Sequence, residues 1–203
     1  MRCGEQYFTR RPSSRGSRQV FAVTLRGHGF QLATEAGVFS RRRVDRGTRL
    51  LIGHMEVRPA DRVLDLGCGY GIVGMVAARL APQGQVVLVD INERAVALAQ
   101  ENLRANGIGN AQVLGGDGFA PLVGQAFDVI ALNPPVRAGN AVVHLLIEQA
   151  RDHLSPAGRF YLVGRTQQGV IRIAAKMGET FGWVEEVAKG GGYRVYLAHR
   201  API

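Results

Sequence analysis

The pattern of hydrophobic and polar positions changes at about residue 60. From Asp61 onward, short runs rich in Val, Leu and Ile alternate with longer segments whose apolar residues recur every three or four positions. The short runs are typical of buried strands and the longer segments of amphipathic helices. This alternation predicts a mostly parallel sheet with helices on both faces. The expected strands are 62–66, 85–89, 111–114, 127–132, 159–163, 183–188 and 193–199, and the expected helices are 72–80, 93–105, 140–153 and 170–180.

The last two expected strands are joined by Lys189-Gly190-Gly191-Gly192, a composition typical of a tight antiparallel turn. The expected fold is therefore α/β, with a seven-stranded sheet in which only the last strand is antiparallel. If the strand before the turn is parallel to the others, the turn lies at the ligand-binding edge of the sheet.

The segment before residue 60 predicts a short extension to this sheet. Ranges 20–25 and 30–34 have strand composition and are expected to pair as a β-hairpin. Range 50–57 is apolar and is expected to form a helix, capped by Asp45 or Thr48.

The length of 203 residues suits one domain, expected over 20–203. Within it, 20–60 would carry the hairpin and helix and 61–203 the ligand-binding core. Range 1–19 is rich in Arg, Ser and Gly and is expected to be a flexible basic tail. No apolar run is long enough for a membrane span, and the two cysteines give neither a disulfide framework nor metal-ligand spacing. We therefore expect a cytoplasmic protein without a metal, with a monomer favoured.

The positive charge is concentrated at the beginning of the chain. Range 1–60 contains 12 Arg and 4 acidic residues, whereas 61–203 contains 13 basic and 12 acidic residues. A general preference for Arg over Lys explains the residue type but not this asymmetry. A solvated arginine-rich tail is one interpretation, but the asymmetry favours a surface that attracts nucleic acid.

Glycines follow the first strand of the expected sheet. Gly67, Gly69 and Gly71 would let the backbone turn sharply and approach a ligand closely. Range 69–74 also fits GxGxxG, so a nicotinamide dinucleotide has to be considered. Asp65, however, would be a poor neighbour for a pyrophosphate. It suits a ligand that carries an amine and a sulfonium, such as S-adenosylmethionine.

Acidic residues also follow the second and third expected strands. Asp90 can accept hydrogen bonds from both hydroxyls of a ribose, and Ile91 beside it can pack on an adenine ring. Asp117, followed by Gly118, is placed to accept from the exocyclic amine of adenine, and Phe119 is expected to cover the ring. Asp117 alone would be explained equally well as a turn residue.

The fourth strand ends in Asn133-Pro134-Pro135. Proline fixes φ and removes a backbone donor, so the Asn133 side-chain oxygen and the Pro134 carbonyl would be two rigid acceptors. Such a pair can hold the two hydrogens of a planar NH2 group and direct its nitrogen toward a methyl donor. Asn133 and Pro134 are therefore the predicted catalytic residues, acting mainly through orientation, and Asn133 is also expected to contact the cofactor.

These motifs resemble those of the class I S-adenosylmethionine-dependent methyltransferases. In particular, the chain is similar to the small-domain methyltransferases that include the guanine-N2 methyltransferases of small-subunit ribosomal RNA, in a single-domain branch. The resemblance implies a Rossmann-like fold, S-adenosylmethionine as cofactor, and pocket-closing roles for Phe39 and Thr48. The matching motifs are DLGCGYG at 65–71, VD at 89–90, GD at 116–117 and NPP at 133–135, with GVFS at 37–40, Asp45 and GTRLL at 47–51 upstream.

One position departs from the family pattern. Many relatives have an aromatic residue after NPP that can stack on the target base, whereas this chain has Val136 followed by Arg137. The Arg137 guanidinium could instead stack on a base or bind a phosphate. The residues expected to bind the substrate are Pro135, Val136 and Arg137 next to the amine, and Lys189, Tyr193 and Arg194 on the last turn.

The favoured activity is methyl transfer to guanine N2 in small-subunit ribosomal RNA, with that RNA or the subunit itself as partner. Methylation of adenine N6 or of a protein glutamine amide is a close alternative. An NAD-dependent oxidoreductase would use the glycines but would leave NPP unexplained. A non-catalytic RNA-binding protein would explain the basic segment and should tolerate loss of Asn133.

Overall fold

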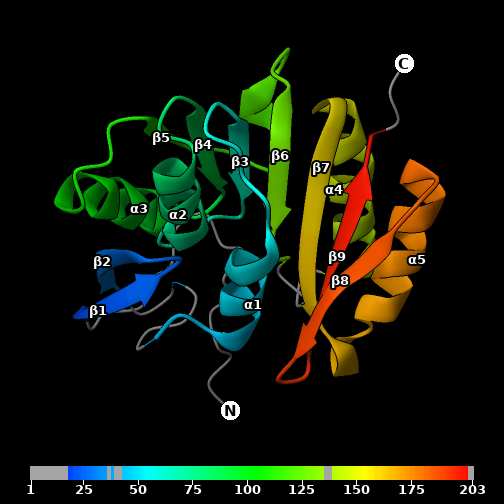
Figure 1. Ribbon diagram of the computed structural model, residues 1–203, viewed down its shortest axis with the longest axis horizontal. Coiled ribbons are helices and arrows are strands. Elements are labelled where there is room, and N and C mark those ends of the chain that lie inside the picture. The colour runs from blue at the N-terminus through cyan, green and yellow to red at the C-terminus, as the bar shows by residue number, and fades with distance from the viewer. Residues whose placement is uncertain (1–17, 36–37, 39–42, 135–138, 201–203) are drawn as a thin grey trace.

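The computed structural model describes residues 18–35, 38, 43–134 and 139–200. This part of the chain forms a seven-stranded sheet with helices on both faces, and a separate two-stranded hairpin (Figure 1). The strands are β1 (Gln19–Leu25), β2 (His28–Thr34), β3 (Arg62–Leu66), β4 (Gln85–Asp90), β5 (Ala111–Gly115), β6 (Phe127–Leu132), β7 (Leu154–Arg165), β8 (Glu185–Gly190) and β9 (Tyr193–His199). The helices are α1 (Arg46–His54), α2 (Ile72–Leu80), α3 (Glu93–Ala105), α4 (Asn140–Asp152) and α5 (Val170–Phe181), with short 3-10 turns at Ala120–Leu122 and Thr166–Gln168.

The strand order is β5-β4-β3-β6-β7-β9-β8. Neighbouring strands from β5 to β7 are parallel, and β9 is antiparallel to both of its neighbours, so β8 runs in the same direction as the rest. The expectation of a mostly parallel sheet with an antiparallel last strand is confirmed. From β3 the chain adds β4 and β5 on one side of the sheet and then β6 and β7 on the other, so the strand order switches between β3 and β6. The carboxyl ends of β3, β4 and β6 surround this point, where such sheets bind ligands.

Two hydrophobic cores hold the layers together, one on each face of the sheet. The first core joins α1, α2, α3 and the hairpin to one face, with Leu51, Met75 and Leu98 among its members. The second joins α4 and α5 to the other face through residues such as Ile147 and Met177. In Figure 1, α1 and α2 lie in front of the sheet and α4 lies behind it. None of the helices in the described ranges is long and apolar enough to cross a membrane.

Several boundaries differ from those expected. The helix expected at 50–57 is α1, Arg46–His54, which begins earlier because the Asp45 side chain accepts hydrogen bonds from the first turn. Strand β7 begins before the expected 159, since a register shift lets it accommodate Ala157 at φ 60° and still pair with β6. The strand expected from 183 begins at Glu185 instead.

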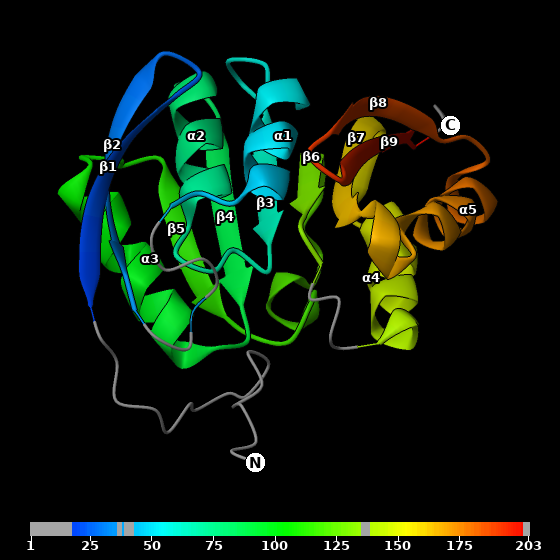
Figure 2. The same ribbon diagram turned by 90° about the horizontal axis from the view of Figure 1, so that it is seen from below.

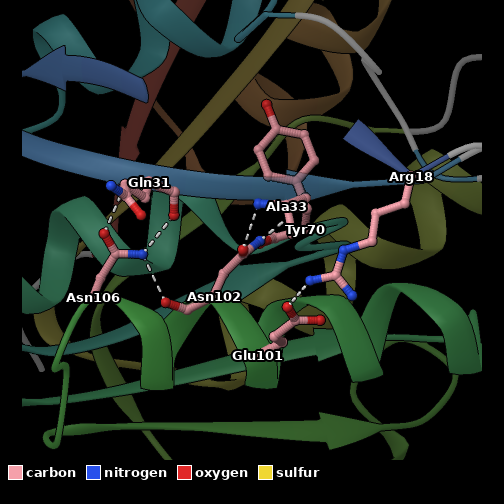
Figure 3. A network of polar contacts seen from close by, with 7 residues as sticks. All are labelled: Arg18, Gln31, Ala33, Tyr70, Glu101, Asn102 and Asn106. Atoms are coloured by element: carbon pink, nitrogen blue, oxygen red, sulfur yellow. Dashed lines mark hydrogen bonds and ion pairs between the residues drawn. The ribbon is translucent and has the colours of Figure 1, made fainter. Parts of the chain in front are cut away.

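The hairpin confirms the expected extension and is attached to the sheet by helix α3. Figure 3 shows two asparagines one helical turn apart, whose amides bond the free edge of β2. Asn106 donates to the Gln31 carbonyl (2.7 Å) and accepts from its N–H (2.9 Å). Asn102 does the same with Ala33 (3.0 and 2.8 Å) and also donates to the Tyr70 carbonyl (2.9 Å). Asn102 therefore links the hairpin to the loop that follows β3.

The hairpin lies beside α2 and α3, on the opposite side of the molecule from α5 (Figure 2). Its turn, Arg26-Gly27, has positive φ at both residues, 50° and 81°, as a two-residue turn between twisted strands requires.

Candidate active site

The glycines after β3 form a tight loop that leads directly into α2. Gly67, Gly69 and Gly71 all have positive φ, of 71°, 58° and 91° respectively. The N–H groups of Gly67 and Cys68 both donate to the Val89 carbonyl, at 2.8 and 3.0 Å, which holds the loop against the end of β4. Around the Cβ position of Gly67 no atom lies within 4 Å, so the backbone there is open to a ligand.

Asp65 lies beneath this loop, with a relative exposure of only 4%. Its carboxylate accepts a hydrogen bond from the Gly74 N–H in the first turn of α2 (2.8 Å). The pKa of Asp65 is raised to about 7, mainly by burial, with the hydrogen bond from Gly74 lowering it and the nearby Asp90 charge adding to the rise. The site thus contains a carboxylate that a neighbouring positive charge would stabilise in its ionised form.

Asp90 connects the glycine loop to the ends of β4 and β5. Its side-chain oxygens accept from the N–H groups of Gly69 (2.8 Å) and Asn92 (2.9 Å). Its main-chain carbonyl accepts from Gly116 (3.0 Å). Ile91 is half-buried beside it, at the position expected for packing on a ring. The backbone bonds fix Asp90 in place at the switch point of the sheet.

The segment after β5 places only part of its expected set at this edge. Asp117 is exposed and Gly118 is half-buried, with φ of 54° at the glycine. Phe119, however, is 3% exposed and packs on His153, the residue that follows α4, with 4.5 Å between ring centroids. The expectation that Phe119 covers a bound adenine is wrong, because the 3-10 turn that follows carries its ring into the second core.

Asn133 follows β6 directly, beside the end of β3, since Leu132 pairs with Leu66. Its side-chain Nδ2 donates to the Thr48 hydroxyl of α1 (3.0 Å). That hydroxyl in turn donates to the carboxylate of Asp45. The sequence indicated Asp45 and Thr48 as capping candidates, but nothing in it indicated a bond to a residue 85 positions away.

Four expected site residues, Phe39, Pro135, Val136 and Arg137, lie outside the described part of the chain. Pro134 is buried next to Asn133. The structure therefore brings Asn133 and Pro134 to the same edge as the glycine loop, Asp65 and Asp90, as the parallel topology requires.

The turn between β8 and β9 reaches the same edge, because β8 is parallel to the other strands. Lys189 is exposed there. Arg194 is paired with Glu186. Tyr193 is only 8% exposed, and its hydroxyl accepts from Arg165 (2.7 Å). Tyr193 is therefore a packing residue beneath α1, and of the three residues expected to contact RNA only Lys189 is exposed.

This arrangement can bind a cationic ligand and a planar amine side by side. Two buried carboxylates flank a loop whose backbone is open; burial is the main cause of the raised pKa of Asp65, and the charge of Asp90 adds to it. A pyrophosphate would increase the repulsion, whereas a ligand with an ammonium or sulfonium would relieve it. The Asn133 amide lies at the neighbouring strand end, where it can orient an acceptor nitrogen.

Comparisons with known proteins show what this chain is similar to. The family described as "MTS: Methyltransferase small domain" matches residues 29–197. The uncharacterized protein YbxB of Bacillus subtilis is 36% identical over 198 residues, covering 97% of this chain and 98% of its own length. The ribosomal RNA small subunit methyltransferase C of Pseudomonas entomophila is 35% identical over 89% of this chain, which corresponds to 54% of that enzyme.

A similar solved structure is that of the Thermus thermophilus 16S rRNA N2 G1207 methyltransferase in complex with AdoMet and guanosine. It has a TM-score of 0.80 and 30% identity, and the match covers 93% of this chain and 52% of that one. The chain thus spans about half the length of these two ribosomal RNA methyltransferases.

Proposed function

Because the chain belongs to the methyltransferase small domain family, we propose that it transfers a methyl group from S-adenosylmethionine to guanine N2 in small-subunit ribosomal RNA. The observation that carries this proposal is the position of Asn133-Pro134 beside the glycine loop, in a chain similar to an enzyme that binds AdoMet and guanosine.

The described residues fit S-adenosylmethionine, which supplies an electrophilic methyl group on a sulfonium. Gly67 offers open backbone, Asp65 offers a carboxylate that favours a nearby cation, and Asp90 lies where a ribose would bind. We assign Ile91 and Asp117 to the adenine. At Gly69, Gly71 and Gly118, the absence of a side chain lets the backbone approach the cofactor closely.

Asn133 and Pro134 act on the second substrate. The side-chain oxygen of Asn133 and the main-chain oxygen of Pro134 accept the two hydrogens of the guanine amine. The lone pair of the amine nitrogen then points toward the methyl group. The new N–C bond forms as the C–S bond breaks, and the alkylated nitrogen then loses a proton to water. No strong base is needed, and the rate comes from proximity and orientation.

The RNA backbone would be held by cations around the β8–β9 turn. Arg46 at the start of α1 and Lys189 are exposed, and the Cβ position of Gly191 is 3.2 Å from the Arg46 Cδ. Arg165 is also exposed and stacks over the Tyr193 ring at 5.1 Å. Phosphates attracted by these side chains would bring a base to Asn133, and Arg137 would be expected to add to this surface.

A second candidate is large-subunit ribosomal RNA. The ribosomal RNA large subunit methyltransferase G of Streptomyces avermitilis is 35% identical over 84% of this chain and 45% of its own length. The same site chemistry would serve, since the acceptor in either RNA is a planar amine.

The decisive experiment is to map methylated bases in ribosomal RNA from a strain lacking this protein, and to add back the purified chain with S-adenosylmethionine. We expect one N2-methylguanine to disappear from the small-subunit RNA and to return on addition. Asn133→Ala should still bind the cofactor but lose methyl transfer by about a hundredfold or more. Undiminished transfer by this variant would contradict the mechanism, and a lost methyl group in the large-subunit RNA would favour the second candidate.

The substrate surface can be tested separately. Replacing Arg46 and Lys189 by Ala should raise the KM for RNA and reduce the dependence of log K on log salt by about one per phosphate contact removed. Arg104→Ala, at the far end of α3, is the matched control and should change neither quantity. An unchanged salt dependence in the double variant would place the RNA elsewhere.

A further inference from the structure

The amide of Asn133 is held on one side by a chain of hydrogen bonds from helix α1. Asn133 Nδ2 lies 3.0 Å from Thr48 Oγ1, and Thr48 Oγ1 in turn bonds Asp45 Oδ2. Thr48 has a relative exposure of 4%, so water has little access to this chain of bonds. The other oxygen of Asp45 accepts from the N–H groups of Gly47 (2.9 Å) and Thr48 (3.2 Å), which fixes the carboxylate at the helix start.

The direction of these bonds follows from the donors available. A carboxylate has no hydrogen to give, so the Thr48 hydroxyl must donate its single hydrogen to Asp45. The same oxygen can then only accept from Asn133. An amide presents either NH2 or oxygen, two ends of nearly the same shape, so its hydrogen-bond partners decide its orientation. Thr48 therefore selects the NH2 end and turns the Asn133 Oδ1 away from α1.

We propose that Asp45 and Thr48 are positioning residues that set the orientation of the Asn133 amide, so that its oxygen and not its NH2 group faces the target amine. This inference rests on the proposed function. With the opposite orientation, the NH2 group of Asn133 would face a hydrogen of the target amine, so this hydrogen would lose its acceptor and the lone pair would no longer be directed at the methyl group. The hydrogen bonds from Asp45 through Thr48 to Asn133 thus let the first turn of α1 control how the target amine nitrogen is held.

A matched pair of variants isolates the hydroxyl. Thr48→Val keeps the shape of the side chain but removes the hydroxyl, whereas Thr48→Ser keeps the hydroxyl. We expect Thr48→Val to lower kcat by about ten- to a hundredfold while the Kd for S-adenosylmethionine changes less than about twofold. Thr48→Ser should restore kcat to near the wild-type value. A Thr48→Val variant with wild-type kcat would overturn the proposal, as would one in which only the cofactor Kd rises.

Asp45→Asn tests the direction of the chain of bonds. Asn caps a helix about as well as Asp, so α1 should be retained and the melting temperature should change little. Its NH2 group, however, can donate to Thr48 Oγ1 and free the hydroxyl hydrogen to point at Asn133. We expect kcat to fall in this variant also, and an unchanged kcat would remove Asp45 from the proposal.

The orientation can also be measured without any RNA. In the wild type and in Thr48→Ser, NMR should show slowed hydrogen exchange for one side-chain NH proton of Asn133. In Thr48→Val this protection should be lost. Equal exchange in all three proteins would overturn the proposed orientation, whether or not the protein methylates RNA. Absence of methyl transfer by the wild type, with the protection pattern present, would instead count against the proposed function alone.

Discussion

Asp65 should couple the binding of S-adenosylmethionine to the release of a proton. Its pKa is raised to about 7 by burial, with a further contribution from the charge of Asp90. Below that pH the carboxyl is mostly protonated, whereas a bound cation requires the ionised form. Cofactor affinity should therefore fall as the pH is lowered through 7.

The size of the effect follows from the pKa of about 7. Each pH unit below the pKa costs about 1.4 kcal/mol of binding free energy, so affinity should drop about fiftyfold between pH 7 and pH 5. The amine of the cofactor remains charged in this range, since α-amino groups titrate near pH 8. At pH 6, about 0.9 protons should be released for each molecule bound.

Isothermal titration calorimetry at pH 6, in two buffers with different ionisation enthalpies, measures this proton release directly. Asp65→Asn is the control, because its side-chain oxygen can still accept from the Gly74 N–H. This variant should release no proton and should bind with little dependence on pH. A wild-type affinity that stays flat from pH 5 to pH 7 would refute the reasoning, as would equal proton release by Asp65→Asn.

The same pKa shift acts on folding with the opposite sign. The folded chain holds a proton on Asp65 between the ordinary value of 3.8 and about 7, whereas the unfolded chain does not. The resulting contribution to stability is fully present below pH 3.8 and is lost as the pH rises to about 7. Urea unfolding of the wild type and Asp65→Asn should therefore show their difference in free energy changing across this range.

Two further predictions concern the scaffold that carries the site. Gly71→Ala combines a φ of 91° with a Cβ only 3.1 Å from Leu88 and Ala99, whereas Gly107→Ala has a φ of 61° and open space. Urea unfolding should show that Gly107→Ala lowers the free energy of unfolding by about 1 kcal/mol and Gly71→Ala by about 3 kcal/mol. Similar losses would mean that the contact of the added Cβ with Leu88 and Ala99 is unimportant. Asn102→Ala leaves buried backbone groups of β2 and of the glycine loop without partners, so it should lower the free energy of unfolding by about 3 kcal/mol. The control Asn106→Ala, at a more exposed site, should lower it by about 1 kcal/mol. Equal losses in the two variants would show that Asn102 does not tie the hairpin to the loop.

The elements of the core could be predicted because their patterns are local. Strands β3, β4 and β6 are short runs of branched apolar residues, and each is followed by turn residues. Parallel topology then brings their ends together, so the sequence alone places Asp65, Asp90 and Asn133 at one edge of the sheet.

Prediction was weaker where the backbone is irregular or where distant segments meet. Phe119 lies in a turn, where neither the strand nor the helix period determines which way a side chain points, so the sequence does not reveal that its ring packs on His153. The bond between Thr48 and Asn133 joins a helix start to a strand end 85 residues later. Such a contact depends on how α1 packs across the sheet, which no local pattern contains.

The antiparallel direction of β9 decides where a label can be attached. Because β9 runs against β7, it starts at the edge that carries the glycine loop and ends at the opposite edge, where Arg200 bonds the Gly158 carbonyl (Figure 1). A fluorophore, an affinity handle or a surface tether attached at Arg200 would therefore lie at the edge opposite the glycine loop. Immobilisation at this position would leave the edge that carries Asp65, Asp90 and Asn133 facing solution.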